Sequence, residues 1–294
     1  MRILKIAMLL LCFMLFMPLS ARLAIKLASN QSSYMQYEQI YMHLRIRNDS
    51  GRPIVFGQNS KLLAKLHFEI TDLKGNIVPE SEAKAIILTR GKVINPGQLG
   101  DIVIKFSNYY KLHRKGIYLI HAYISHPMFK EQFKSNDVRV EISPGITVWS
   151  RTIGMPDGKL NKDGNTVTPD SERTYSIRKL NDGAGQFFYC VLEDKTKIYQ
   201  IFRMAPVTKS GLPERMIDMS GALHLLVNVS PRIYKYCKLD ITGELIEGNK
   251  YYKVTKTQPI LFKGKDGNIF VNGGAPAIPN VDFHVRQASF KVAE

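Results

Sequence analysis

The sequence predicts an all-β protein with two parts: an N-terminal antiparallel β-sandwich of the immunoglobulin-like kind and a β-rich C-terminal domain. Apolar and polar residues alternate with a period of two along much of the chain, and short strand-like runs are separated by turns rich in Gly, Pro and Asn. No long stretch has the period of an amphipathic helix. The length of 294 residues suits two domains of ordinary size.

The chain opens with the layout of a secretion signal. Arg2 and Lys5 form a basic head, an uncharged apolar run follows, and small residues end the segment at Ala21. We therefore expect residues 1–21 to be a signal peptide and the protein to be exported, whether periplasmic, on the cell surface or secreted. The apolar run is shorter than the ~20 residues that comfortably span a bilayer, so we expect a membrane contact only if this segment stays uncleaved.

The sandwich is expected over residues 22–148. Its clearest strand covers 40–47, where four apolar side chains alternate with Tyr, His and Arg, so that one face is buried. Further strand-like runs lie at 66–70, 102–106, 117–124 and 138–142.

Parts of this region resemble a known family of domains. The run Tyr37-Glu38-Gln39-Ile40 with the turn at 47–54 looks like the second strand and turn of immunoglobulin-like or macroglobulin-like domains. Residues 95–98 and 115–122 are similar to the closing strands of those domains. The resemblance covers about 23–143 and implies a module that binds or spaces, with no catalytic residue to carry over. The Cys…Trp…Cys core of antibody domains is absent.

Beyond the sandwich, we expect a linker at 149–173, which begins at the single Trp149 and is rich in Gly, Asn, Asp and Lys. The remaining β-rich domain, 174–294, contains a weak repeat: a shift of 35 residues aligns 190–192 with 225–227. The same shift aligns 198–199 with 233–234, and a poorer copy begins at 265. Such a period is typical of propeller blades, but three copies are too few to close a propeller. We therefore expect a meander or propeller-blade-like repeat that forms a compact domain or part of an assembly.

Two cysteines remain after the predicted leader, Cys190 and Cys237, and both lie in apolar strand-like runs. In an oxidising compartment they can form a disulfide, and the alternative is two separate buried thiols. No Cys-x-x-Cys is present, so neither a zinc ribbon nor a thioredoxin-like site is expected.

Sequence motifs for catalysis are missing. The chain has no Gly-x-Ser-x-Gly, no phosphate-binding Gly-x-x-x-x-Gly-Lys and no His-Glu-x-x-His. The loop at 157–165 resembles part of a calcium loop, but Lys159 occupies the place of the first acidic ligand. We therefore expect no catalytic residue, no metal and no cofactor, and a protein that is not an enzyme.

The charge and the Tyr/Lys pattern of the C-terminal domain indicate an acidic partner. The sequence holds 41 Lys and Arg against 25 Asp and Glu, a net charge of +16. The basic residues are spread along the chain, which also fits a role in solubility alone. Within the C-terminal domain, aromatic and cationic side chains alternate, and we expect Tyr236, Lys238, Tyr252 and Lys253 to contact a ligand. The alternative is that the Tyr residues are core and the Lys residues the solvated face of the same strands.

These observations predict an exported, non-enzymatic binding protein of the cell envelope whose partner is an acidic polysaccharide or another envelope protein. Nucleic acid is not expected outside the cytoplasm. One alternative is a carbohydrate-active enzyme or accessory fragment, in which two of Asp182, Asp194, Asp218 and Asp240 would share a cleft. Another is a scaffold module in an exported assembly, which would pair through an exposed strand edge.

Overall fold

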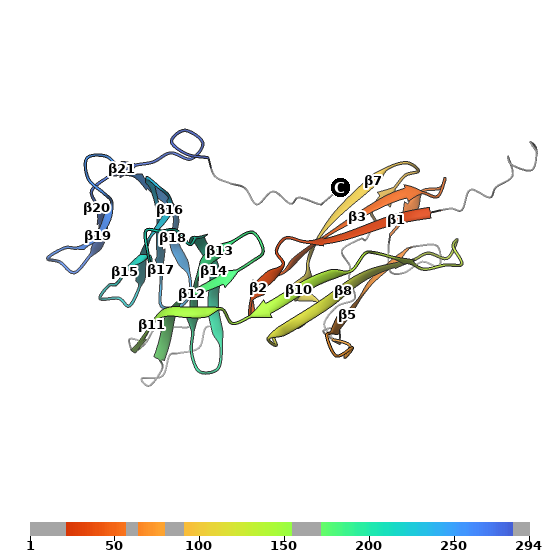
Figure 1. Cartoon of the computed structure of the whole chain (residues 1–294), viewed down its shortest axis with the longest axis horizontal. Coiled ribbons are helices and arrows are strands. Elements are labelled where there is room, and N and C mark those ends of the chain that lie inside the picture. Colours follow the sequence, from red (N-terminus) through yellow and green to blue (C-terminus); the bar gives the residue numbers. More distant parts are fainter. Residues whose placement is uncertain (1–21, 57–63, 80–90, 155–171, 285–294) are drawn as a thin grey trace, which may run out of the picture.

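The computed structural model describes residues 22–56, 64–79, 91–154 and 172–284. Within these ranges the chain forms strands and one 3-10 turn, η2 (Phe106–Asn108), which confirms the all-β prediction (Figure 1). The predicted leader and the calcium-like loop at 157–165 lie outside these ranges. None of the described helices has the length and apolar character needed to cross a membrane.

The N-terminal part is a sandwich of two sheets, with strand order β1-β3-β7 in one and β2-β10-β8-β5 in the other. The short strand β9 adds to β8, and β4 pairs with β6 separately. Pairing is antiparallel as predicted, except that β10 and β2 run parallel. The strands are β1 (Arg22–Ser29), β2 (Ser33–Met35), β3 (Tyr41–Asp49), β4 (Ile54–Val55), β5 (Lys65–Asp72), β6 (Val93–Ile94), β7 (Leu99–Lys105), β8 (Gly116–Ser125), β9 (Phe133–Lys134) and β10 (Val138–Ser143).

The core of the sandwich follows from the period-two pattern. On β3 the apolar residues Met42, Leu44 and Ile46 are buried and the residues between them are not, as the sequence predicts. Aromatic rings fill one end of this core: Phe106 and Tyr110 stack with centroids 4.7 Å apart, and Phe68 meets Phe106 edge-on at 5.2 Å.

The C-terminal part consists of consecutive antiparallel meanders that stack face to face, which we call the stack (Figure 1). One sheet has the order β11-β12-β13-β14, the next β15-β16-β17-β18-β21, and β19 pairs with β20. The strands are β11 (Ile146–Gly154), β12 (Glu172–Asn181), β13 (Gln186–Glu193), β14 (Ile198–Pro206), β15 (Glu214–Ile217), β16 (Leu223–Ser230), β17 (Ile233–Leu239), β18 (Leu245–Lys253), β19 (Ile260–Lys263), β20 (Ile269–Asn272) and β21 (Ala275–Pro276).

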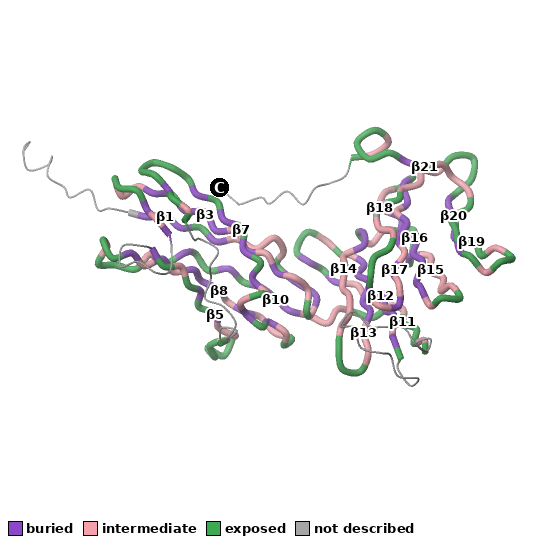
Figure 2. Tube along the Cα trace, turned by 180° about the vertical axis from the view of Figure 1, so that it is seen from behind, coloured by how far each residue is buried: buried purple, intermediate pink, exposed green. Residues whose placement is uncertain are grey.

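The predicted repeat maps onto corresponding strands of the two large sheets. Its first pair of segments lies in β13 and β16, its second in β14 and β17, and the poorer third copy in the β19–β20 hairpin. The units follow one another as consecutive antiparallel sheets, in keeping with the predicted meander or blade-like repeat. One apolar core lies between the two large sheets, and a second lies between the β15–β18 sheet and the β19–β20 hairpin. Figure 2 shows buried positions following β16 and β17, which lie between these two cores.

The structure places residues 149–154 and 172–173 of the predicted linker in strands β11 and β12. Strand β11 continues to Gly154 and pairs with β12 along its length. The physical reason is that Trp149 and Ile153 pack against the core between the two large sheets. Residues 155–171 are outside the described ranges.

The two cysteines are free thiols and do not form the disulfide that the sequence left open. Cys190 on β13 and Cys237 on β17 are both fully buried in the core between the two large sheets. Burial raises the pKa of Cys237 to about 11 and also raises that of Cys190. Both thiols therefore stay protonated and unreactive at neutral pH.

The sandwich and the stack meet through a small apolar contact and a polar network. Met35 of β2 packs in one buried cluster with Leu180 and Tyr189 of the stack. The backbone N–H of Ser32 donates to the carbonyl of Asp182 at 3.0 Å, and the Tyr189 hydroxyl donates to Gln31 Oε1 at 3.1 Å. These bonds connect residues about 150 positions apart in sequence and fix one loop of each part against the other.

Gly183 is required where the two loops touch. It has φ +93°, and a Cβ built on it would lie 2.1 Å from Ser32 Oγ. A side chain at this position would therefore strain the backbone and push the two parts of the molecule apart.

The substitution Gly183→Ala tests this contact, and Gly211→Ala is its matched control. Gly211 has nearly the same backbone, φ +91°, but nothing lies within 4 Å of a Cβ there. Both variants incur a left-handed backbone cost of about 1–2 kcal/mol. We expect Gly183→Ala to lower the free energy of unfolding by at least about 1 kcal/mol more than the control, as measured by urea denaturation. Equal losses would show that the two loops do not touch in solution.

Candidate functional site

Two of the residues expected to bind a ligand belong to a buried polar cluster in the stack. Tyr236 is only 5% exposed, and its hydroxyl lies 2.8 Å from Nδ1 of His224. The Nε2 atom of His224 lies 3.0 Å from Oδ2 of Asp218, and the ammonium of Lys238 lies 3.4 Å from the same oxygen. With His224 neutral, Tyr236 donates to Nδ1 and the Nε2–H donates to Asp218, so the polar groups of this cluster satisfy one another.

The other two expected residues lie on β18. Tyr252 packs half-buried against the core beneath the β19–β20 hairpin, and the ammonium of Lys253 donates to Asp282 Oδ1 at 2.6 Å. The structure thus places all four residues on neighbouring strands of one sheet. It does not bring them together as an open platform, because the hairpin covers the Tyr face and each Lys has a carboxylate partner. This arrangement matches the alternative in which the Tyr residues belong to the core.

The four aspartates weighed as catalytic carboxylates shape hairpin turns. Asp194, Asp218 and Asp240 each accept hydrogen bonds from two backbone N–H groups of the turn that follows. Asp182 accepts from the Ala184 N–H and forms an ion pair with Arg203. Such bonds are the ordinary use of Asp in tight turns. Within the described ranges, no group of three His, Cys, Asp or Glu side chains is arranged to hold a metal ion.

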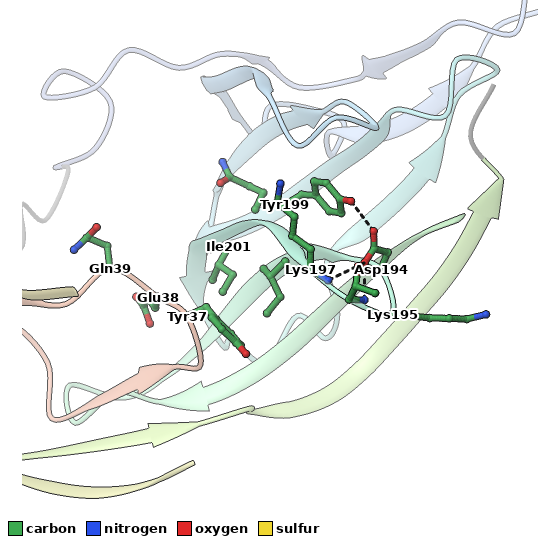
Figure 3. Close-up of a pocket in the computed structure, with 11 residues that line it drawn as sticks. Tyr37, Glu38, Gln39, Asp194, Lys195, Lys197, Tyr199 and Ile201 are labelled. Atoms are coloured by element: carbon green, nitrogen blue, oxygen red, sulfur yellow. Dashed lines mark hydrogen bonds between the residues drawn. The ribbon is translucent and has the colours of Figure 1, made fainter. Parts of the chain in front are cut away.

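A cleft of about 570 Å³ lies where the sandwich meets the stack (Figure 3). One wall is the segment 37–39, which connects β2 to β3. The other wall is the β13–β14 hairpin, from Asp194 to Ile201. The cleft therefore exists only because the two parts of the molecule are in contact.

Tyr37 forms the sandwich side of this cleft. It has φ +69°, a left-handed backbone that is uncommon for a residue other than glycine. Its ring stacks on His113 with centroids 4.7 Å apart, yet 52% of the residue remains exposed. An aromatic ring is thus held in a fixed position at the cleft by a strained backbone and by a second ring.

Glu38 anchors the 37–39 segment at the contact between sandwich and stack. Its carboxylate accepts hydrogen bonds from the Met35 N–H at 2.7 Å and from Gln31 Nε2 at 3.1 Å. Burial raises the pKa of Glu38 above its ordinary value, although both hydrogen bonds act to lower it. The carboxylate is committed to holding the 35–38 turn.

Tyr199 and its partners form the stack side. The Tyr199 hydroxyl donates to Asp194 at 2.5 Å, and the Arg173 guanidinium lies 3.8 Å from the centroid of the Tyr199 ring. Burial acts to raise the pKa of Asp194, but the bonds from Tyr199 and from the turn lower it to about 2. The ammonium of Lys197 lies 5.2 Å from the same ring, whereas Figure 3 shows Lys195 directed away from the cleft.

The cleft was not predicted from the sequence. The sequence marks Tyr37 only as part of the resemblance to immunoglobulin-like domains, and the β13–β14 turn only through Asp194, one of the carboxylates considered for catalysis. The turn chemistry of Asp194 and Thr196 is readable from sequence, but nothing in the sequence indicates that residues 37 and 199 meet.

The comparisons with known proteins do not assign a family. No family model and no curated protein matches the chain. Among solved structures, the sporulation control protein Spo0M from Bacillus subtilis is similar to 77% of this chain and 80% of its own, with 8% identity and a TM-score of 0.29. That degree of similarity supports no conclusion about fold or function.

The buried cluster makes stability depend on pH through His224. Burial lowers the pKa of His224, although the bond to Asp218 acts to raise it, and Lys238 lowers it further. Below the ordinary histidine pKa the unfolded chain therefore takes up a proton that the folded chain resists, so stability falls as the pH falls.

Replacing His224 by Gln removes this titration. Between about pH 7.5 and pH 5.5, we expect the wild type to lose stability faster than His224→Gln, with a difference of up to about 1 kcal/mol per pH unit. Thermal unfolding across this range measures both slopes. Parallel slopes would show that His224 keeps an ordinary pKa.

Proposed function

We propose that this protein is an exported, non-enzymatic binding protein of the cell envelope that holds an acidic polysaccharide in the cleft between sandwich and stack. The observation that carries the proposal is the pair of aromatic side chains, Tyr37 and Tyr199, that line one cleft with the cation of Lys197 beside them. An aromatic face provides apolar surface for a sugar ring, and a nearby ammonium attracts a sugar carboxylate.

Three further features support this proposal. The first 21 residues have the layout of a signal peptide, and the net charge of +16 favours anionic partners. The resemblance of the N-terminal part to immunoglobulin-like or macroglobulin-like domains fits a module that binds without catalysis. The carboxylates near the cleft have structural tasks, since Glu38 holds a turn and Asp194 holds another.

Because the backbone of Tyr37 is strained, a substitution there can test ligand binding without destabilising the fold. Replacing Tyr37 by Gly removes the ring and also relieves the left-handed strain, so we expect no loss of stability. We expect the same variant to bind acidic oligosaccharides at least about tenfold more weakly. Titration calorimetry with polygalacturonate and hyaluronate fragments, at low and physiological salt, measures both the affinity and its salt dependence.

The contribution of the Lys197 ammonium to binding can be tested against a matched control. Lys197→Gln is expected to weaken binding and to reduce its salt dependence, whereas Lys209→Gln, at an exposed loop position outside the cleft, is expected to change neither. Wild-type affinity in both Tyr37→Gly and Lys197→Gln would exclude this cleft as the binding site. No binding of any acidic glycan at either salt would instead favour the scaffold function, for which the exposed rings of Phe262 and Phe270 are the available surface.

A further inference from the structure

A second cleft opens at the edge of the stack, away from the contact between sandwich and stack. It has a volume of about 620 Å³, and no residue that lines it also lines the cleft at Tyr37. It lies between β11 and β15, the terminal strands of the two large sheets (Figure 1). Lys263, the last residue of β19, also lines it. Three cationic side chains line it: Arg151, Arg215 and Lys263.

A β-bulge in β11 directs Trp149 and Arg151 toward this cleft. Thr147 pairs with Arg178 and Trp149 with Ile177, so Val148 is the extra residue. Without the bulge, Trp149 would pair with the next residue of β12 and point to the opposite face of the sheet. With it, Trp149 lies opposite Ile177, whose side chain belongs to the core between the sheets. Arg151 is two positions along and therefore shares that face.

Strand β15 supplies the facing wall by the same alternation. Arg215 pairs with Leu225 and Ile217 with Leu223, and both leucines belong to the core between the large sheets. Arg215 therefore points toward the first sheet, and its guanidinium lies over the Trp149 ring, 5.1 Å from the centroid. Its Nη1 atom also donates to the Pro213 carbonyl at 3.0 Å. These two contacts hold the guanidinium in one orientation before any ligand arrives.

The charge of the cleft is positive. Glu214 is the carboxylate that lines it, and one of its oxygens accepts the Leu261 N–H at 2.8 Å. Three cations thus face one partly engaged carboxylate. Arg151 and Lys263 are exposed, so their charged ends are accessible to a ligand.

We propose that this edge cleft is a phosphate-binding site. In it the guanidinium of Arg215, already fixed in orientation, binds phosphate oxygens, and Arg151 and Lys263 supply further positive charge. A planar guanidinium matches two phosphate oxygens at once, and a phosphate group carries enough charge to engage more than one cation. The source of the phosphate is either a soluble or polymeric phosphate ester or a phospholipid headgroup. The site is separate from the proposed glycan cleft and stands whether or not that cleft binds sugar.

The only tryptophan of the chain lies in this site, so its fluorescence reports on the site alone. We expect tripolyphosphate, added to the purified protein, to change the Trp149 emission saturably, and sodium chloride at matched ionic strength not to do so. Calorimetry measures the same affinity independently of the fluorophore. Arg151→Gln and Arg215→Gln are each expected to weaken binding at least about tenfold, and Lys74→Gln, on the sandwich, to leave it unchanged.

Variants of the protein test whether this cleft binds phosphate, and lipid vesicles test whether the phosphate is a headgroup. Arg151→Gln leaves the Trp149–Arg215 pair in place, so its effect does not depend on disturbing the fold. Binding of tripolyphosphate assigns a soluble or polymeric phosphate, and binding only to phosphatidylglycerol vesicles, not to phosphatidylcholine vesicles, assigns a headgroup. Absence of binding to all of these probes, or equal binding by Arg151→Gln, Arg215→Gln and wild type, would overturn the proposal.

Discussion

The face-to-face burial of the two large sheets of the stack is the constraint on which the rest of the structure depends. The central strands β13 and β16 are buried along most of their length, and their side chains fill the core that both sheets share. Burial of such side chains is worth about 1.5–3 kcal/mol each, which makes the stacking strongly favourable. It also fixes which strands are left at the edges. Both clefts lie where this packing ends, one at the β13–β14 turn and one between β11 and β15.

The contact between sandwich and stack differs in character, because it is small and mostly polar. Met35 supplies the apolar part, and the loops around Ser32 and Asp182 supply backbone bonds. The ion pair of Asp182 with Arg203 and the hydrogen-bonded carboxylate of Glu38 lie at this contact, and the Asp182 side chain is fully buried. Buried charges of this kind specify one arrangement, because sliding the two surfaces would leave them without partners.

The sequence was informative wherever one physical rule acts locally. The alternation of apolar and polar residues predicted the buried face of β3. The 35-residue repeat predicted which strands correspond in the stacked sheets. The polar and glycine-rich composition that follows Trp149 concealed the β11 strand, whose Trp149 and Ile153 pack into the core.

The candidate sites were harder to predict because they depend on contacts between distant segments. Alternation indicates which Tyr and Lys residues share a face, but it does not reveal that the β19–β20 hairpin covers the face of Tyr236. Nor does it reveal the bulge that turns Trp149 inward or the left-handed backbone of Tyr37. The turn roles of Asp194, Asp218 and Asp240 differ from these features, because each depends only on the few residues that follow the Asp.

The central claim is that sandwich and stack form one fixed unit, so that the cleft at Tyr37 is a built site. The distance between spin labels on Lys74→Cys and Lys195→Cys, one exposed position on each part, tests this most directly. With Cys12 replaced by Ser, the labels go only to the new positions, because Cys190 and Cys237 are buried. If the two parts form one fixed unit, the labels give one narrow distance distribution that does not change with salt. A broad or multiple distribution would show that the two parts move independently, and would contradict the central claim.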